Sequence, residues 1–351
     1  TSKSEVGLIG LGVMGTSLAR NISRNGFTLS IYNRHLEGIE EEVAKKMIDQ
    51  FPELQFSKPF DDLEKFVASL EKSKKIILMV NAGKSVDDVI GKLVPLLQAG
   101  DVIVDGGNSH FRDTGSRRKK LSVGGVHFLG TGISGGAEGA LLGPSIMPGG
   151  SKQGFELVKD VLLAIAARNE LNEICCDYIG DGGAGHFVKM IHNGIEYAEM
   201  QLIAEFYSHF RYDQQKDTEE IAHIFEDWNQ GDASSYLLGI TIDILRRKDA
   251  DGLPLIDKIS DEAGNKGTGS WTTITACELG VPVPAMTEAL FSRYLSSFKT
   301  DRNRYADIYD NEETQVLIQG ESLRHTYMFC RIINHYQGIK LIKEASVNFE
   351  W

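Results

Sequence analysis

The chain opens with an apolar segment, EVGLIGLG, which leads directly into three glycines at a fixed spacing, Gly10, Gly12 and Gly15. The residues before the glycines predict a strand, and VMGTSLARNISRNG after them has the spacing of a helix. In such a unit the first glycine permits a tight turn, the second lets the backbone approach a phosphate, and the third lets helix and strand pack closely. A diphosphate then lies on the helix N-terminus. The opening therefore predicts a dinucleotide-binding domain.

Alternation of strand-like and helix-like segments continues through the first half of the chain. Further strands are predicted at FTLSIYNR, KKIILMV, DVIVDGGN, GVHFLGTGISGG and NEICCDYIG, and KSVDDVIGKLVPLLQAG is predicted as a helix with an interior proline. This alternation indicates βαβ units and a parallel sheet. After about Gly185 the apolar residues recur at helical spacing and strand signals almost vanish. We therefore expect a Rossmann-type, doubly wound α/β domain over residues 1–182 and an all-α domain over residues 183–351.

Composition narrows the classes of function. At 351 residues the chain is long enough for two domains. Its net charge of −12 and isoelectric point near 5.3 disfavour a nucleic-acid binder, and no apolar run is long enough to span a bilayer. The four cysteines match no metal-ligand spacing. We expect a cytoplasmic protein without a metal, in which a few placed cations and backbone N–H groups bind any anionic ligand.

The end of the second predicted strand indicates which dinucleotide is bound. An NAD site normally carries Asp or Glu at this point, bonded to the ribose 2′-hydroxyl. This chain reads Tyr32-Asn33-Arg34-His35, with no carboxylate to repel a 2′-phosphate. The guanidinium of Arg34 can bind such a phosphate through two parallel hydrogen bonds. The sequence therefore predicts NADP rather than NAD.

A polar stripe on one predicted helix suggests acid–base chemistry. The stripe consists of Lys189, His192, Asn193 and Glu196, whose spacing places them on one helical face. A surface ladder of ion pairs is the alternative interpretation. Gly194 disfavours it, because a mid-helix glycine costs about 1 kcal/mol relative to alanine unless something must approach closely. Gly-rich turns at the ends of other strands would present the polar side chains of Asn108 and Ser134 to the same ligand region.

Five segments together resemble one family. GLIGLGVMG, DGGNS, GISGGAEGALLGPSIMPGG, HFVKMIHNGIEY and NKGTGSWT are similar to the corresponding segments of decarboxylating 6-phosphogluconate dehydrogenases, and the resemblance extends from residue 5 to the end. It implies that the chain oxidises 6-phosphogluconate with NADP, releasing CO2 and ribulose 5-phosphate without a metal. It also implies a homodimer that serves the pentose phosphate pathway and gluconate utilization.

The resemblance implies roles for individual residues. Lys189 resembles the general base that takes the proton of the 3-hydroxyl while hydride leaves C3, and Glu196 resembles the acid that protonates C1 of the resulting enediol. The groups that orient the sugar acid are expected at Asn108, Ser134, Gly135, Gly136, His192 and Asn193. Its phosphate is expected at Tyr197, Lys266 and Arg293. Cofactor contacts are expected from Gly10, Leu11, Gly12, Val13, Met14, Gly15, Asn33, Arg34, His35, Val80, Asn81, Ala82 and Asn108.

The chain also departs from the family pattern. Asn81 replaces a usual lysine, Ala137-Glu138 replaces two acidic residues, and Ser270 replaces another lysine. The family continues beyond the segment resembled by IKLIKEASVNFEW, and its tail brings an arginine and a histidine into the partner subunit's site. We expect the helical domain of this chain to be truncated relative to the family and to lack both groups.

Two other functions stay open at this point. The first is that of a shorter β-hydroxyacid dehydrogenase of the 3-hydroxyisobutyrate type, which shares the cofactor turn, the S-G-G turn and a catalytic lysine. An enzyme of this type would not account for the segment DGGNSHF or for the long second domain. The second is that of an NADP-binding protein without turnover, which Asn81 and Ala137 would favour and the intact pair Lys189 and Glu196 disfavours.

Overall fold

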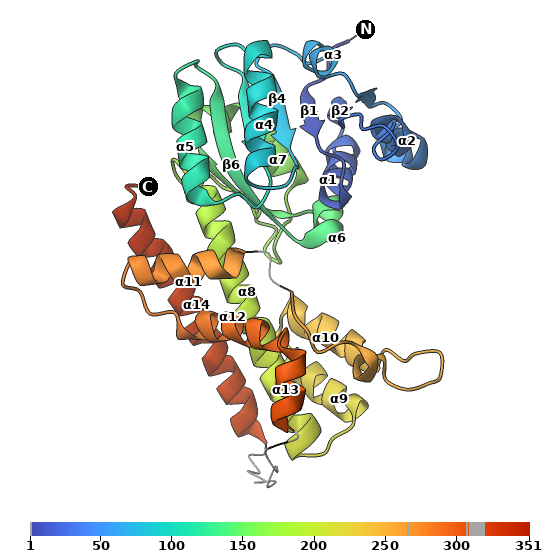
Figure 1. Cartoon of the computed structure of the whole chain (residues 1–351), viewed down its shortest axis with the longest axis vertical. Helices are drawn as coiled ribbons and strands as arrows, with labels where there is room; N and C mark the ends of the chain where they lie inside the picture. Colours follow the sequence, from blue (N-terminus) through green and yellow to red (C-terminus); the bar gives the residue numbers. More distant parts are fainter. Residues whose placement is uncertain (1, 265–266, 307, 309–319) are drawn as a thin grey trace. The chain divides into compact units, whose positions relative to one another are not determined.

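The computed structural model describes residues 2–264, 267–306, 308 and 320–351. The chain divides into two units, one comprising residues 1–190 with 349–351 and the other residues 191–348. Both units are drawn in Figure 1. Lys266, one of the expected phosphate-binding residues, lies outside the described residues.

The first unit is built on a single seven-stranded sheet. Its strands are β1 (Val6–Ile9), β2 (Leu29–Tyr32), β3 (Lys58–Phe60), β4 (Lys75–Leu78), β5 (Val102–Asp105), β6 (His127–Ser134) and β7 (Ser145–Gly150). They lie in the order β3-β2-β1-β4-β5-β6-β7, and every neighbouring pair is parallel except β6 with β7. The order reverses between β1 and β4, which is where a doubly wound sheet opens a crevice for a ligand.

Helices cover both faces of this sheet (Figure 1). They are α1 (Val13–Arg24), α2 (Val43–Gln50), α3 (Leu63–Ala68), α4 (Lys84–Leu93), α5 (Phe111–Ser122), α6 (Gly136–Leu142) and α7 (Lys152–Ile165), with short 3-10 turns at Pro52–Leu54 and Val94–Leu96. One buried cluster joins α1, α2 and α7 to the sheet, and a second joins α3, α4 and α5 to it. Alternate residues of a strand enter different clusters: Val102 and Val104 of β5 lie in the first and Ile103 in the second.

The expected fold class is confirmed, and two local predictions are wrong. The segment NEICCDYIG forms no strand, because only isolated bridges such as Ile146 to Cys176 join it to β7. The helix predicted through LVPLLQAG ends at Leu93, and Pro95 lies in the 3-10 turn that follows. A proline has no N–H to continue the helical ladder, so the chain turns there.

The second unit is helical within the residues described. Its elements are α8 (Ala184–Ser208), whose first residues belong to the first unit, a π-helical turn (His209–Asp213), α9 (Thr218–Trp228), α10 (Tyr236–Arg246), α11 (Thr268–Glu278), α12 (Pro284–Ser296), α13 (Lys299–Ala306) and α14 (Glu321–Asn348), with 3-10 turns at Gly231–Ala233 and Leu255–Lys258. An aromatic cluster of Phe206, Phe210, Phe225, Trp228 and Tyr327 joins α8, the π-helical turn, α9 and α14. Asp217 begins α9 with a capping box that includes Glu220.

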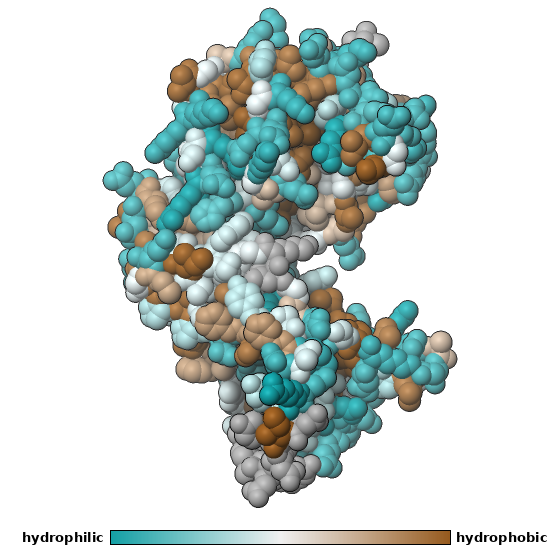
Figure 2. All heavy atoms as spheres, viewed as in Figure 1, coloured by the Kyte–Doolittle hydropathy of each residue, from teal (hydrophilic) through white to brown (hydrophobic). Residues whose placement is uncertain are grey.

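Apolar side chains also lie on the surface of the second unit. Brown and tan spheres interrupt its hydrophilic surface in Figure 2. The exposed side chains include Ile274 on α11, Leu295 on α12 and Phe329, Ile332 and Ile339 on α14, each more than half exposed. No helix among the described residues is both long and apolar enough to cross a membrane.

Candidate functional site

The glycines after β1 have the three geometries that a dinucleotide turn requires. Gly10 has a φ of 95°, and a side chain there would lie 2.5 Å from the carbonyl oxygen of Met79. A side chain at Gly15 would overlap the carbonyl oxygen of Gly10, so Gly15 is needed where α1 packs on the turn. Gly12, by contrast, has no atom within 4 Å of an added Cβ and stands at the N-terminus of α1. The space above Gly12 is therefore open to a ligand phosphate.

A cleft of about 720 Å³ lies beside this turn. Leu11, Gly12 and Val13 line one side of it, and residues from Gly38 to Phe51 contribute to the other. Leu11 donates its backbone N–H to the Asn33 side chain at 3.3 Å, which ties the turn to the end of β2. The cleft therefore borders the expected diphosphate position, within the first unit.

The prediction that no carboxylate opposes a 2′-phosphate overlooked Glu40. Its carboxylate accepts hydrogen bonds from the expected 2′-phosphate ligand Arg34, at 3.0 Å from Nη2, and from the expected cofactor contact Asn33, at 2.8 Å from Nδ2. These bonds, first that of Arg34 and then that of Asn33, hold the pKa of Glu40 below its usual value. The Arg34 side chain is 69% exposed, so its pairing with Glu40 is weak and exchangeable. A 2′-phosphate would have to displace the Glu40 carboxylate from both residues.

Two loops at the carboxyl ends of β4 and β5 carry further expected ligands. The loop after β4 holds Val80, Asn81 and Ala82, and the loop after β5 holds Asn108, whose side chain is exposed. The two loops nearly touch, since a Cβ at Gly107 would lie 3.0 Å from the Val80 carbonyl oxygen. The structure therefore brings these expected ligands to the same edge of the sheet as the glycine turn.

Ser134, Gly135 and Gly136 lie at the end of β6, where α6 begins. Gly135 and Gly136 have φ values of 122° and 61°, and both residues are exposed. Other residues rarely adopt these angles. The turn therefore presents backbone N–H groups at the start of a helix, beside the half-buried Ser134.

Lys189 lies in the second turn of α8 and is 8% exposed. The helix start packs directly on β6 and β7, because a Cβ at Gly132 would overlap Lys189 and one at Gly149 would overlap the backbone of Gly185. Glycines on these strands thus let the lysine backbone lie against the sheet. Burial of an ammonium is costly in a protein interior, and Lys189 has interaction partners there.

His186, one turn before Lys189, is buried between the loop after β5 and α5. Its Nε2 lies 3.1 Å from the Asp105 carbonyl oxygen and its Nδ1 lies 2.7 Å from Thr114 Oγ1. Burial lowers the pKa of the imidazole, despite the nearby Asp105 carboxylate. A neutral imidazole can donate to the carbonyl and accept from the hydroxyl. His186 therefore fixes the start of α8 to the end of β5, directly before the loop that holds Asn108.

The remaining part of the α8 stripe lies in the second unit. His192 Nδ1 is 3.2 Å from Asn193 Oδ1 and 4.0 Å from Glu196 Oε2. Asn193 Nδ2 reaches Thr268 Oγ1 at 3.4 Å, at the N-terminus of α11. Gly194 admits α11 and α12 rather than a ligand, since a Cβ there would lie 2.9 Å from Met286 Sδ and 3.0 Å from Thr272 Cγ2.

Two of the expected phosphate ligands are in direct contact. The Arg293 guanidinium carbon lies 3.7 Å from the centroid of the Tyr197 ring, and Arg293 Nη1 donates to the Gly264 carbonyl oxygen at 2.8 Å. The start of α11 packs on the same tyrosine, because a Cβ at Gly269 would lie 3.0 Å from its ring. A cation, a phenol and a helix N-terminus therefore gather in one place, which is an arrangement suited to an anion.

Sequence reasoning missed three groups that organise the first unit: Glu40, His186 and Arg117. Arg117 bonds Asp87 and approaches Asp105, which lies at the end of β5. In the sequence it begins the run Arg117-Arg118-Lys119-Lys120, which is typical of a solvated helix face. The alternate glycines of GTGISGG gave a usable signal, because glycine within a strand often marks a close backbone approach.

Comparison with known families covers almost the whole chain. A family model described as the NAD binding domain of 6-phosphogluconate dehydrogenase matches residues 5–180, and one described as the C-terminal domain of 6-phosphogluconate dehydrogenase matches residues 185–351. Among relatives, "6-phosphogluconate dehydrogenase, decarboxylating" of Escherichia coli K12 is 45% identical over 100% of this chain and 74% of its own length. "6-phosphogluconate dehydrogenase, NADP(+)-dependent, decarboxylating" of Bacillus subtilis is 43% identical over the same shares.

Solved structures show the same family likeness. The 6-phosphogluconate dehydrogenase of Plasmodium falciparum superimposes with a TM-score of 0.92 at 37% identity, over 99% of this chain and 75% of that one. A 3-hydroxyisobutyrate dehydrogenase of Salmonella typhimurium superimposes with a TM-score of 0.63 at 19% identity, over 86% and 95%. That second likeness shows a shared fold alone. On the family models and the identity to full-length relatives, the chain belongs to the 6-phosphogluconate dehydrogenase family.

Proposed function

We propose that this protein oxidatively decarboxylates 6-phosphogluconate to ribulose 5-phosphate and CO2 and reduces NADP in the process. The observation that carries the proposal is family likeness across both units together with an intact Lys189 and Glu196 on α8. The relative from Bacillus subtilis is named as NADP-dependent, and the structure from Plasmodium falciparum is titled as including complexes with NADP+ and with 6-phosphogluconate.

The residues present fit NADP. The open space at Gly12 and the N–H groups that begin α1 suit the diphosphate, while Asn33 and Arg34 suit the 2′-phosphate once Glu40 moves away. When bound, the nicotinamide supplies a hydride acceptor. Val80, Asn81 and Ala82, which follow β4 where the strand order reverses, would hold its nicotinamide end.

Lys189 serves as the base in this proposal. Its Nζ takes the proton of the 3-hydroxyl as the C3–H bond breaks and the hydride leaves, which forms a ketone at C3. A base of this kind must be neutral when the substrate is bound, and burial favours the neutral form of a lysine. Packing of α8 on Gly132 keeps the lysine backbone in one position, so the proton is taken at a fixed place.

The ketone then permits loss of CO2. The bond from the carboxyl carbon breaks, its electron pair moves into the sugar, and Lys189 returns its proton to the carbonyl oxygen, which gives an enediol. Glu196 protonates C1 of that enediol, which completes ribulose 5-phosphate. Asn108, Ser134, Gly135, Gly136, His192 and Asn193 orient the sugar acid. Tyr197, Arg293 and Lys266 receive its phosphate.

The proposal extends to organisation and location. Residues 1–182 bind NADP, and residues 183–351 provide substrate binding and dimerisation. Exposed apolar side chains on α11, α12 and α14 support a homodimer, since such side chains usually mark an interface when they lie close together. The four cysteines are free thiols, which supports a cytoplasmic location. Sedimentation equilibrium tests the homodimer, and a monomer at all concentrations would refute it.

Turnover with two substrates tests the activity. We expect NADPH and CO2 to form in equal amounts from 6-phosphogluconate, and no comparable NADPH formation from 3-hydroxyisobutyrate. Preferential oxidation of 3-hydroxyisobutyrate would favour the shorter β-hydroxyacid dehydrogenases instead. NADP binding without turnover of either substrate would indicate a non-catalytic NADP-binding protein. Lys189→Ala serves as the control for background oxidation.

A further inference from the structure

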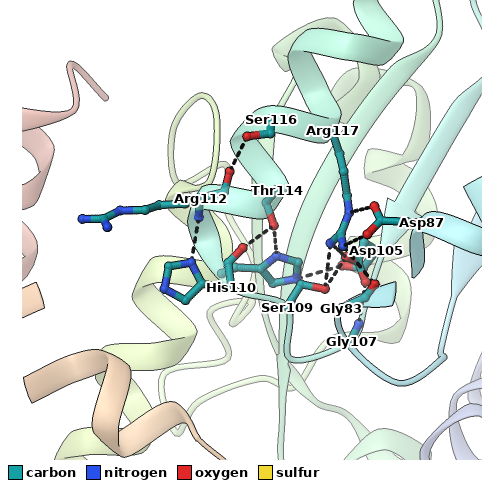
Figure 3. Close-up of polar contacts among 11 residues, drawn as sticks. Gly83, Asp87, Asp105, Gly107, Ser109, His110, Arg112, Thr114, Ser116 and Arg117 are labelled. Carbon is teal, nitrogen blue, oxygen red and sulfur yellow. Dashed lines mark hydrogen bonds and ion pairs between the residues drawn. The ribbon is translucent and has the colours of Figure 1, made fainter. Parts of the chain in front are cut away.

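Arg117 is a buried cation that takes no part in the chemistry described so far. It lies on α5, and its side chain is 7% exposed. Figure 3 shows the guanidinium between Asp87 and Asp105, with Ser109 and Gly83 close to it. An arginine is rarely buried unless its donors are paired, so its partners indicate what it holds together.

The partners of Arg117 come from two segments: the loop before α4 with the first turn of α4, and the end of β5 with the loop that follows it. On the side of β4, Nε and Nη2 donate to the two oxygens of Asp87 at 2.7 and 3.0 Å, and Nη2 also donates to the Gly83 carbonyl oxygen at 3.0 Å. On the side of β5, Nη1 lies 3.4 Å from Ser109 Oγ and 3.7 Å from Asp105 Oδ2. A planar guanidinium is the one side chain that can make this set of bonds from a single position.

Each loop is also ordered internally around these partners. Asp105 is fully buried and accepts hydrogen bonds from Ser109 Oγ at 2.6 Å and from the Gly107 N–H at 3.1 Å. Gly83 begins α4 with a φ of 81°, which favours glycine. Arg117 therefore joins two loops that are each already shaped, and it sets the distance between them.

The two loops carry ligands for different molecules. Asn81 follows β4 on the loop assigned to NADP, and Asn108 follows β5 on the loop assigned to both NADP and the sugar acid. We propose that Arg117 is a positioning residue that fixes the β4–α4 loop against the β5–α5 loop, and thereby fixes the nicotinamide against C3 of the substrate. This inference rests on the proposed function, although the loop ordering on which it depends does not.

The substitution Arg117→Met tests the inference, with Arg118→Met as the matched control. Arg118 is the next residue of the same helix and pairs with Asp181 instead of with either loop. We expect Arg117→Met to lower kcat on the order of 10²-fold, because misplacement by about 1 Å costs that much in a reaction that depends on alignment. NADP affinity should change only a few-fold, since Gly12 and Arg34 are untouched. Arg118→Met should change neither quantity.

Hydrogen exchange provides a readout that needs no substrate. In Arg117→Met the backbone amides of residues 80–86 and 105–109 should exchange faster than in the parent protein, and in Arg118→Met they should not. Failure of the proposed function would appear as an inactive parent protein with the exchange difference intact. Parental exchange rates and parental kcat in a folded Arg117→Met would overturn the inference.

Asp87→Asn is a second, milder variant that tests the same inference if Arg117→Met does not fold. The Asp87 side chain is 58% exposed, and Arg117 keeps its approach to Asp105 in this variant. We expect faster exchange over residues 80–86 alone, with residues 105–109 unchanged, and a smaller fall in kcat than in Arg117→Met. Unchanged exchange over residues 80–86 would also overturn the inference.

Discussion

Replacing Gly132 with alanine tests whether the catalytic lysine depends on a close approach between a helix and a strand. The added Cβ would overlap Lys189 Cβ and would lie 3.0 Å from its Cγ and 3.2 Å from the Gly185 carbonyl oxygen. Carbon atoms normally stay about 3.5–4.0 Å apart. Strand β6 is paired with β5 on one side and β7 on the other, so it is held in place. The start of α8 must therefore move, by on the order of 1 Å.

Two quantities should change in Gly132→Ala. The free energy of unfolding should fall by about 1–3 kcal/mol, as is usual when a packed core receives an extra carbon. The kcat should fall on the order of 10²-fold, because the base is displaced from the substrate hydroxyl. Urea unfolding and steady-state turnover of 6-phosphogluconate measure the two effects. The KM for NADP should stay close to that of the parent protein, because the glycine turn after β1 is unaffected.

Gly91→Ala is the matched control for this substitution. Gly91 lies on α4, is exposed and has no atom within 4 Å of an added Cβ. Alanine there should leave kcat unchanged and raise stability by about 0.5–1 kcal/mol, since glycine is unfavourable inside a helix. A folded Gly132→Ala variant with parental kcat would refute the argument that packing of α8 on β6 positions Lys189.

Other substitutions test separate parts of the account. Arg34→Asp should shift the cofactor preference from NADP toward NAD. Glu40→Gln should strengthen NADP binding several-fold, because a carboxylate that competes for Arg34 is removed. Steady-state kinetics with both cofactors measures each change, and an unchanged ratio of kcat/KM for NADP to that for NAD would place the 2′-phosphate elsewhere. Glu196→Gln should slow protonation of the enediol, the step after CO2 release, while substrate affinity is largely kept. Rapid-quench analysis measures the formation of CO2 and of ribulose 5-phosphate, and parental rates for both products would contradict this prediction. Burial keeps the pKa of His186 below its value in the unfolded chain, so the unfolded state binds the proton first and stability falls as the pH drops below about 6.5. His186→Gln should abolish this contribution, of up to about 1.4 kcal/mol per pH unit in urea unfolding, and an identical pH slope in the two proteins would refute it.

In the first unit, the sequence predicted those features that depend on the spacing of residues close together in the chain. The glycines at 10, 12 and 15 allow one strand–turn–helix geometry, and their φ values and close approaches agree with it. The alternation of strands and helices likewise predicted the doubly wound sheet. Short β3 was not predicted, because a three-residue edge strand that contains a proline has no periodic pattern.

The groups that order the site could not be found in the same way, because their partners are distant in sequence. Arg117 meets Asp87 across 30 residues, and His186 meets the Asp105 carbonyl across 81. Neither residue differs by type or spacing from a solvated arginine or an ordinary core histidine. Glu40 lies only 6 residues from Arg34, yet it reaches Arg34 through a turn that has no repeating pattern. Burial and pairing appear only when the chain is folded.

The central claim is that hydride transfer to NADP and loss of CO2 occur on the same substrate molecule. Single turnover of 6-phosphogluconate that carries deuterium at C3 and ¹³C in the carboxyl group tests it most directly, with mass spectrometry of both products. We expect one deuterium in the reduced cofactor for each ¹³CO2 released, and neither product from Lys189→Ala. Reduced cofactor without deuterium, or deuterium transfer without ¹³CO2, would contradict the account.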